Sequence, residues 1–117
     1  MGTVAIVDYG VGNLKSVANA LSYLGCSSCI TADPAELERA DAIILPGVGA
    51  FPDAADRLRS GGLDQHVLAQ GQKKPVLGIC LGMQLLLEQG REVRPCPGLG
   101  VIRGTVDRIP TQSKLPH

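Results

Sequence analysis

The sequence contains no tryptophan, and its 117 residues include only two tyrosines and one phenylalanine. An aromatic platform for stacking nucleic-acid bases is therefore not expected. Basic and acidic residues number 11 each, so the formal net charge is zero, and neither nucleic acid nor a membrane surface is favoured as a partner. No apolar run approaches the ~20 residues of a membrane span. We expect a cytoplasmic protein, because the N-terminus opens into a strand-like run without a signal sequence.

Metal and redox signals are also weak. Cys26-Ser-Ser-Cys29 has the spacing of a redox motif, but it follows a predicted helix and leads into a strand, whereas the thioredoxin motif opens a helix. No second pair of cysteines completes a zinc site. We therefore predict no metal and no cofactor, and we interpret Cys26 and Cys29 as small residues at the end of a helix, with a redox or metal role as the alternative.

Apolar runs and helical spacings alternate along the chain, and glycine or proline punctuates them. The predicted strands are Thr3–Val7, Ser27–Thr31, Ala42–Leu45 and Val76–Ile79, and one or two more over Leu99–Ile109. The predicted helices are Leu14–Leu24, Pro34–Arg39, Asp53–Arg59, Leu63–Gln70 and one from Met83 to near Gly90, with a polar loop over Arg91–Gly98. Strands alternating with helices predict an α/β fold, an open, mostly parallel sheet with helices on both faces.

The segment Pro75 to Leu87 carries the strongest chemical signal. A short apolar strand, a cysteine at position 80 and a helix follow one another, with Gly78 and Gly82 two positions either side of the cysteine. This is the thiol version of the Gly-x-Ser-x-Gly nucleophile elbow. Such a turn would lift Cys80 out of the sheet at a helix N-terminus, where unpaired N–H groups favour the thiolate. The alternative is a tight turn with a small core cysteine.

Two further glycine-rich loops leave the same edge of the sheet, because the carboxyl ends of parallel strands share one edge. Gly10-Val-Gly12 begins like a dinucleotide fingerprint, but Lys15 stands where the third glycine belongs, so a turn before the N-cap Asn13 is favoured. Gly47-Val-Gly49 is either another turn or a segment that presents N–H groups beside Cys80.

A cysteine nucleophile usually needs a base, and only His66 and His117 are available. His66 follows about two turns of helix that lead away from the active edge, a descent of roughly 10 Å. His117 is the last residue, so the pattern gives it no fixed place. Neither histidine is a convincing partner for Cys80.

The chain resembles the N-terminal part of a class I, triad-type glutamine amidotransferase domain, and more narrowly the glutaminase subunit of imidazole glycerol phosphate synthases. The resemblance covers essentially the whole chain. Its motifs are Asp8-Tyr-Gly-Val-Gly-Asn-Leu-Lys-Ser-Val17, Leu45-Pro-Gly-Val-Gly-Ala-Phe51, Gly78-Ile-Cys-Leu-Gly-Met-Gln-Leu-Leu86 and Gly98-Leu-Gly-Val-Ile-Arg-Gly104. The elbow is shared across class I amidotransferases, whereas the first two segments are more particular to the glutaminase subunit.

The resemblance implies that Cys80 attacks the carboxamide of glutamine to give a glutamyl thioester and ammonia. It implies that the backbone at Val48, Gly49 and Leu81 forms the oxyanion hole or holds glutamine, and that the Gln84 side chain binds it. Gly47, Gly78 and Gly82 would be the structural glycines of the site. An exposed helical glutamine is the plainer interpretation of position 84.

The family's ammonia passes to a cyclase subunit with a (β/α)8 barrel, so the resemblance implies a heterodimer. Gly10, Gly12, Asn13 and His117 would face that partner. The family's catalytic His and Glu come well downstream, so residues 1–117 correspond to the N-terminal portion of a single domain and are expected to lack activity alone. Two alternatives are a non-catalytic α/β fragment and a related thiol-elbow family, although that family usually has His where Leu81 stands.

Overall fold

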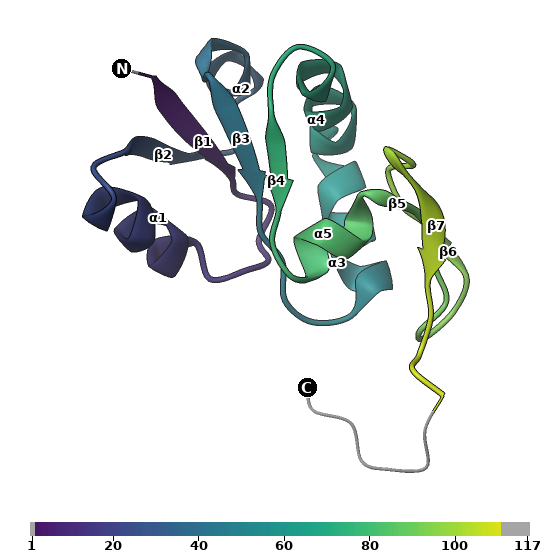
Figure 1. Cartoon of the computed structure of the whole chain (residues 1–117). Helices are drawn as coiled ribbons and strands as arrows, with labels where there is room; N and C mark the ends of the chain where they lie inside the picture. The colour runs from purple at the N-terminus through teal and green to yellow at the C-terminus, as the bar shows by residue number, and fades with distance from the viewer. Residues whose placement is uncertain (1, 111–117) are drawn as a thin grey trace.

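The computed structural model describes residues 2–110 and contains two sheets (Figure 1). The larger sheet is formed by β1 (Thr3–Val7), β2 (Ser27–Thr31), β3 (Ala42–Leu45) and β4 (Val76–Gly78). The strand order is β2-β1-β3-β4, and every neighbouring pair is parallel. The predicted α/β fold is confirmed, and three of its four strands have the predicted bounds, since their apolar, β-branched runs suit a buried parallel sheet.

Five helices lie between the strands within residues 2–110. They are α1 (Leu14–Tyr23), α2 (Pro34–Arg39), α3 (Phe51–Ser60), α4 (Leu63–Gly71) and α5 (Leu81–Leu85). The Asn13 side chain accepts from Ser16 N–H and caps α1, and Asp33 caps α2 in the same way through Ala35 N–H. The chain moves from β1 to β2 in one direction and from β2 past β1 to β3 in the other, so right-handed crossovers place α1 and α2 on opposite faces.

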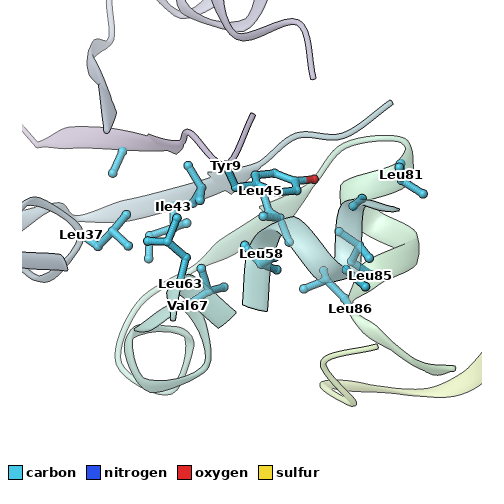
Figure 2. Packing of buried hydrophobic residues seen from close by; sticks show 14 of the residues in the cluster. Tyr9, Leu37, Ile43, Leu45, Leu58, Leu63, Val67, Leu81, Leu85 and Leu86 are labelled. Carbon is cyan, nitrogen blue, oxygen red and sulfur yellow. The ribbon is translucent and has the colours of Figure 1, made fainter. Parts of the chain in front are cut away.

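The core fills the face of the sheet that carries α2, α3 and α4 (Figure 2). Side chains of β1 and β3 pack there against Leu37 of α2, Leu58 of α3 and Val67 of α4, all of them fully buried. The other face is less covered, because α1 lies over β1 and β2 and leaves β4 uncovered there. Leu77 of β4, beside Ile44 in register, is 58% exposed on that face, and the last apolar residue predicted for α1, Leu24, is 71% exposed.

The helix after the elbow is shorter than predicted. It ends at Leu85, and Leu87–Gly90 forms β5 instead of continuing the helix to Gly90. The carbonyls that would close the next helical turn are engaged elsewhere, since Leu85 O accepts from Leu99 N–H and Leu86 O accepts from Ile102 N–H. This competition from a later segment is not visible in the local pattern, which has good helix formers throughout.

A small second sheet was not predicted. It joins β5 to β6 (Cys96–Pro97) and β7 (Ile102–Val106) in the order β6-β5-β7. The predicted loop over Arg91–Gly98 therefore contains a short strand, and one strand rather than two lies within Leu99–Ile109. Other predicted ends move by one or two residues, and α3 starts at Phe51 because Pro52 suits the first turn of a helix.

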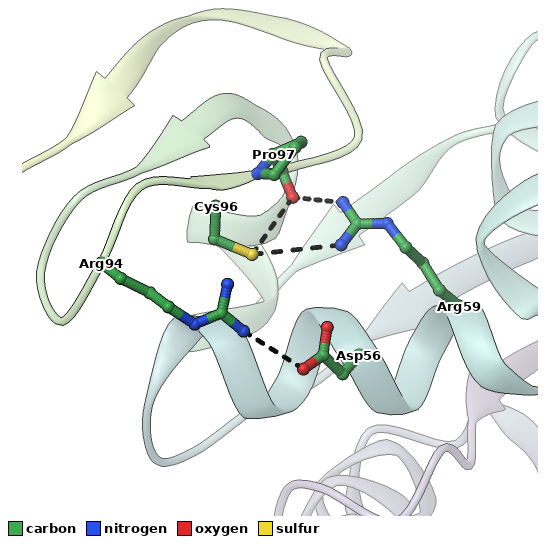
Figure 3. Close-up of polar contacts among 5 residues, drawn as sticks. All are labelled: Asp56, Arg59, Arg94, Cys96 and Pro97. Atoms are coloured by element: carbon green, nitrogen blue, oxygen red, sulfur yellow. Dashed lines mark hydrogen bonds and ion pairs between the residues drawn. The ribbon is translucent and has the colours of Figure 1, made fainter.

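Arginine side chains connect the small sheet to α3 (Figure 3). The Arg59 guanidinium donates to the carbonyl oxygen of Pro97 and contacts the Sγ atom of Cys96 at 4.0 Å. Arg94 forms an exposed ion pair with Asp56 at 3.4 Å, which is expected to contribute little because water screens it. The contacts of Arg59 with Cys96 and Pro97 therefore join β6 to α3.

The Lys74 ammonium closes the C-terminus of α2. Its Nζ atom donates to the carbonyl oxygens of Leu37, Glu38 and Ala40 at 2.8, 2.7 and 2.6 Å. Lys74→Met is expected to lower the free energy of unfolding by about 1–2 kcal/mol, because three carbonyls lose a charged donor. Urea denaturation measures this, with Lys73→Met as the matched control expected to stay within ~0.5 kcal/mol of the parent. Equal effects at both positions would contradict this role for Lys74.

Candidate active site

Cys80 occupies the strained position of a strand-to-helix elbow. It lies between β4 and α5, is exposed, and has φ 57° and ψ −120°. It is the only residue other than glycine with a positive φ in the described part of the chain. A side chain in this conformation is costly, so the surrounding structure must hold it there. The predicted elbow is therefore confirmed as a conformation.

The two flanking glycines permit the tight turn because side chains cannot fit there. A Cβ atom on Gly82 would lie 1.9 Å from the carbonyl oxygen of Leu45, and one on Gly78 would lie 2.5 Å from the Cα atom of Met83. The Leu45 carbonyl also accepts a hydrogen bond from Ile79 N–H at 3.0 Å. Strand β3 therefore supports both sides of the elbow, directly before and after Cys80.

The three glycine-rich loops meet at this edge of the sheet, as predicted. A Cβ atom on Gly47 would lie 2.6 Å from the backbone nitrogen of Gly82, and one on Gly12 would lie 3.1 Å from Pro46. The loop after β1 therefore packs on the loop after β3, which packs on the elbow after β4. This order places Val48 and Gly49 on the segment next to the elbow, where both are exposed.

The tyrosine of the first loop is buried beneath this arrangement. The Tyr9 hydroxyl donates to the carbonyl oxygen of Pro46 at 2.5 Å, and the side chain is only 6% exposed. Burial raises the pKa of Tyr9 to about 12, because the phenolate would lose its hydration. Tyr9 was not among the residues predicted for the site; its signal in the sequence was a rare aromatic residue directly before the glycine-rich turn.

The buried Tyr9 is expected to lower the stability of the fold at high pH. The pKa of the phenol is 10.0 in the unfolded chain, its ordinary value, whereas burial raises it to about 12 in the folded chain. The contribution of Tyr9 to the free energy of unfolding is therefore complete below pH 10 and is lost as the pH rises through 12. The loss is at most ~2–3 kcal/mol. Unfolding free energies measured from pH 9 to 12 test this. The same decrease in Tyr9→Phe would contradict it.

The remaining residues predicted for the site fall into two groups. Gln84 is half-buried in α5, one turn beyond Cys80, and its N–H donates to the Cys80 carbonyl at 3.2 Å. The Leu81 side chain is buried in the core cluster, at the end that lies to the right in Figure 2. The buried Leu81 side chain is therefore not available at the thiol, and the predicted role of its backbone N–H stays a prediction.

A groove of about 360 Å³ runs between the first two glycine-rich loops. It is lined by residues 10–12 and 48–50 and by Asp53, Ala54 and Arg57 of α3. The Arg57 guanidinium lies beside Gly10, since a Cβ atom there would be 3.0 Å from Arg57 Nη1. Of the residues predicted to face a partner, Gly10 and Gly12 line this groove and Asn13 follows them as the N-cap of α1, while His117 lies outside the described residues.

The other candidate nucleophiles and bases lie apart from this edge. His66 is exposed in α4, which sits toward the start of the strands, whereas α5 sits at their carboxyl ends (Figure 1). Burial, then the charge and hydrogen bond of Glu36, raise the pKa of the half-buried Cys29 thiol. Cys96 is buried beside Arg59, and Cys26 is exposed.

Residues 2–110 contain no cluster of three metal-ligating side chains. They also contain no helix that is long and apolar enough to cross a membrane.

Comparison with protein families decides the relationship. The model described as "Glutamine amidotransferase class-I" matches residues 5–114, nearly the whole chain. The chain belongs to this family. The match spans all three glycine-rich loops and the elbow.

Curated relatives of this class I amidotransferase chain point to one group within the family. This chain is 50% identical over 115 residues to the imidazole glycerol phosphate synthase subunit HisH of Oceanobacillus iheyensis. It is 46% identical to the HisH subunit of Bacillus anthracis. Both alignments cover 97% of this chain but only 57% and 55% of the relatives. The chain thus spans slightly more than half the length of the relatives it matches.

Solved structures show the same fold. A crystal structure of a glutamine amidotransferase superposes with a TM-score of 0.76 at 25% identity, covering 92% of this chain and 57% of the other. A putative peptidase E protein from Listeria monocytogenes superposes with a TM-score of 0.70 at 15% identity, covering 86% of this chain and 63% of the other. The second likeness concerns the fold alone.

Proposed function

We propose that this class I amidotransferase chain carries the nucleophile half of a glutaminase site. The Cys80 thiolate would attack the carboxamide carbon of glutamine, and the C–N bond would break as the nitrogen leaves as ammonia. Water would then cleave the glutamyl thioester to glutamate and restore the thiol. The observation that carries the proposal is the positive φ of Cys80, because a strained non-glycine residue persists only where surrounding structure imposes it.

The backbone around Cys80 would stabilise the negative charge on the tetrahedral intermediate. We assign the N–H groups to Val48, Gly49 and Leu81, since the second loop packs directly on the elbow through Gly47 and Gly82. Gln84, one helical turn from Cys80, would bind the glutamine substrate through its side chain. This assignment uses the observed convergence of the loops as its support, together with the family resemblance.

The base would come from outside the part described. His66 lies in α4, away from the carboxyl edge of the sheet. The resemblance places the catalytic His and Glu of the family further along than residue 117. We therefore interpret residues 1–117 as the N-terminal portion of one amidotransferase domain, which supplies the thiol and the oxyanion donors.

The partner would be a cyclase subunit with a (β/α)8 barrel, as the similarity to the synthase subunits named HisH suggests. The ammonia would be used there in histidine biosynthesis, in the cytoplasm. We place the docking surface at Gly10 and Gly12, which line the groove beside the oxyanion loop, and at Asn13, which follows them in the chain. Cross-links from the opposite edge, near Ser60–Leu63, to the barrel would contradict this placement.

The substrate assignment is tested with a chloroketone analogue of glutamine. Its reaction forms an S–C bond to Cys80 and releases chloride, so the intact mass rises by one analogue per chain. Glutamine is expected to slow the reaction in a saturable way, because glutamine and the analogue compete for one site. Asparagine and glutamate are not expected to slow it. Cys80→Ala should remove the fast adduct. Equal protection by all three amino acids would show that no glutamine site exists.

A further inference from the structure

Tyr9 connects two loops at the centre of the site. It follows β1, and its hydroxyl donates to the carbonyl of Pro46, which follows β3. Figure 2 shows the Tyr9 hydroxyl oxygen directed towards the end of the cluster that holds Leu81. The Tyr9 hydroxyl is also 2.9 Å from the position that a Cβ atom on Gly47 would take. The hydrogen bond therefore fixes the peptide group between Pro46 and Gly47.

The next residues of this loop have little else to hold them. Val48 is 63% exposed, and no atom lies within 4 Å of a Cβ atom built on Gly49. Gly49 also has φ +100°, so its own backbone is free to take other conformations. The orientation of the Val48 and Gly49 N–H groups is consequently set from the two ends of the loop, at Pro46 and Gly47 on one side and at the buried Phe51 of α3 on the other.

We propose that Tyr9 is a positioning residue that orients the oxyanion donors of Val48 and Gly49 through its hydrogen bond to Pro46. The inference rests on the proposed glutaminase function for its chemical meaning. Oxyanion donors act only when they are held within hydrogen-bond distance of the developing charge. A tyrosine suits this task because its ring is anchored in the core while its hydroxyl reaches the loop.

The test compares the two tyrosines of the chain. Tyr9→Phe keeps the ring and removes the hydroxyl, and Tyr23→Phe makes the same change at a side chain that is 91% exposed. Nitrogen-15 relaxation measures the order of individual N–H groups. The order parameters of Val48 and Gly49 should fall from ~0.85 towards 0.6 or less in Tyr9→Phe and stay unchanged in Tyr23→Phe. Unchanged order parameters in Tyr9→Phe would overturn the proposal.

Chemical reactivity supplies a second measurement. Reaction with the chloroketone should slow about 10-fold in Tyr9→Phe, because its ketone oxygen would occupy the oxyanion site. Methyl methanethiosulfonate, which carries no carbonyl, should react at the parent rate; an equal slowing of both reagents would overturn the proposal. If the parent protein has no glutamine site, the proposed function fails, and the relaxation data still decide the role of Tyr9.

A second variant tests the proposal if Tyr9→Phe does not fold. Difluorotyrosine at position 9 keeps the ring and the hydroxyl, but its hydroxyl ionises at lower pH and can then no longer donate to Pro46. The order parameters of Val48 and Gly49 should fall as this hydroxyl ionises. Constant order across its titration would overturn the proposal.

Discussion

Gly82→Ala is expected to displace the elbow and to abolish the fast reaction of Cys80 with the glutamine analogue. The new Cβ atom would lie 1.9 Å from the carbonyl oxygen of Leu45, a backbone atom that cannot rotate away. Relief requires α5 to move from β3, which also weakens the hydrogen bond from Ile79 N–H to Leu45 O. We expect the free energy of unfolding to fall by ~3 kcal/mol or more, the upper range for overpacking.

Gly61→Ala is the matched control for this substitution. Gly61 has φ −94°, and no atom lies within 4 Å of a Cβ atom placed there. Urea denaturation and the analogue reaction should therefore give near-parental values for Gly61→Ala. A Gly82→Ala protein that keeps both parental stability and parental reactivity would show that the elbow is not packed against β3 as described.

A polypeptide of these 117 residues is expected to turn over glutamine at least 10²–10⁴-fold more slowly than an enzyme with a complete triad, since general acid–base help has about that size. The departing ammonia needs a proton, and the water that cleaves the thioester needs a base. Members of a triad act as a unit, so a thiol without its base forfeits most of the rate. Ammonia release from glutamine, measured with and without a cyclase subunit, provides the value.

Fast turnover that disappears in Cys80→Ala would contradict this expectation. It would mean that a base within these residues serves the thiol, and His66→Ala would then identify or exclude the histidine of α4. Turnover that survives in Cys80→Ala would instead indicate contamination, because the proposed chemistry requires the sulfur atom.

The larger sheet could be predicted because its signals are local. Thr3–Val7 and Ala42–Leu45 are short β-branched or aliphatic runs between turn residues, and Asp33-Pro34 combines an N-cap with a proline in the first turn. The convergence of the glycine-rich loops also followed from the sequence, since parallel strands end at one edge. These features required only the alternation of strands and helices.

The small sheet and the short α5 could not be predicted from neighbouring residues. The helix stops at Leu85 because the backbone of Leu99–Ile102 supplies donors to the carbonyls of Leu85, Leu86 and Leu87. Gly90 then lies against the ring of Phe51, where a Cβ atom would be 2.6 Å from ring carbon. Both contacts join segments far apart in the sequence, so tertiary packing overrides the helical propensity of Met83–Glu88.

The site shows the same division. The spacing of Gly78, Cys80 and Gly82 predicted the elbow, because that pattern reflects a requirement of the local backbone. The hydrogen bond from Tyr9 to Pro46 joins residues 37 positions apart and became visible only when the loops were placed together. The rare aromatic residue directly before the glycine-rich turn is the signal in the sequence that pointed to it.

The account depends most directly on which cysteine the glutamine analogue modifies. The protein is treated with one equivalent of the chloroketone, digested, and analysed by mass spectrometry for adducts at Cys26, Cys29, Cys80 and Cys96. We predict that the analogue modifies Cys80 and that glutamine suppresses this reaction. Cys26, which is also exposed, should remain unmodified. Modification of Cys26 ahead of Cys80, or labelling of Cys80 that glutamine does not slow, would contradict the assignment of this elbow as a glutaminase nucleophile.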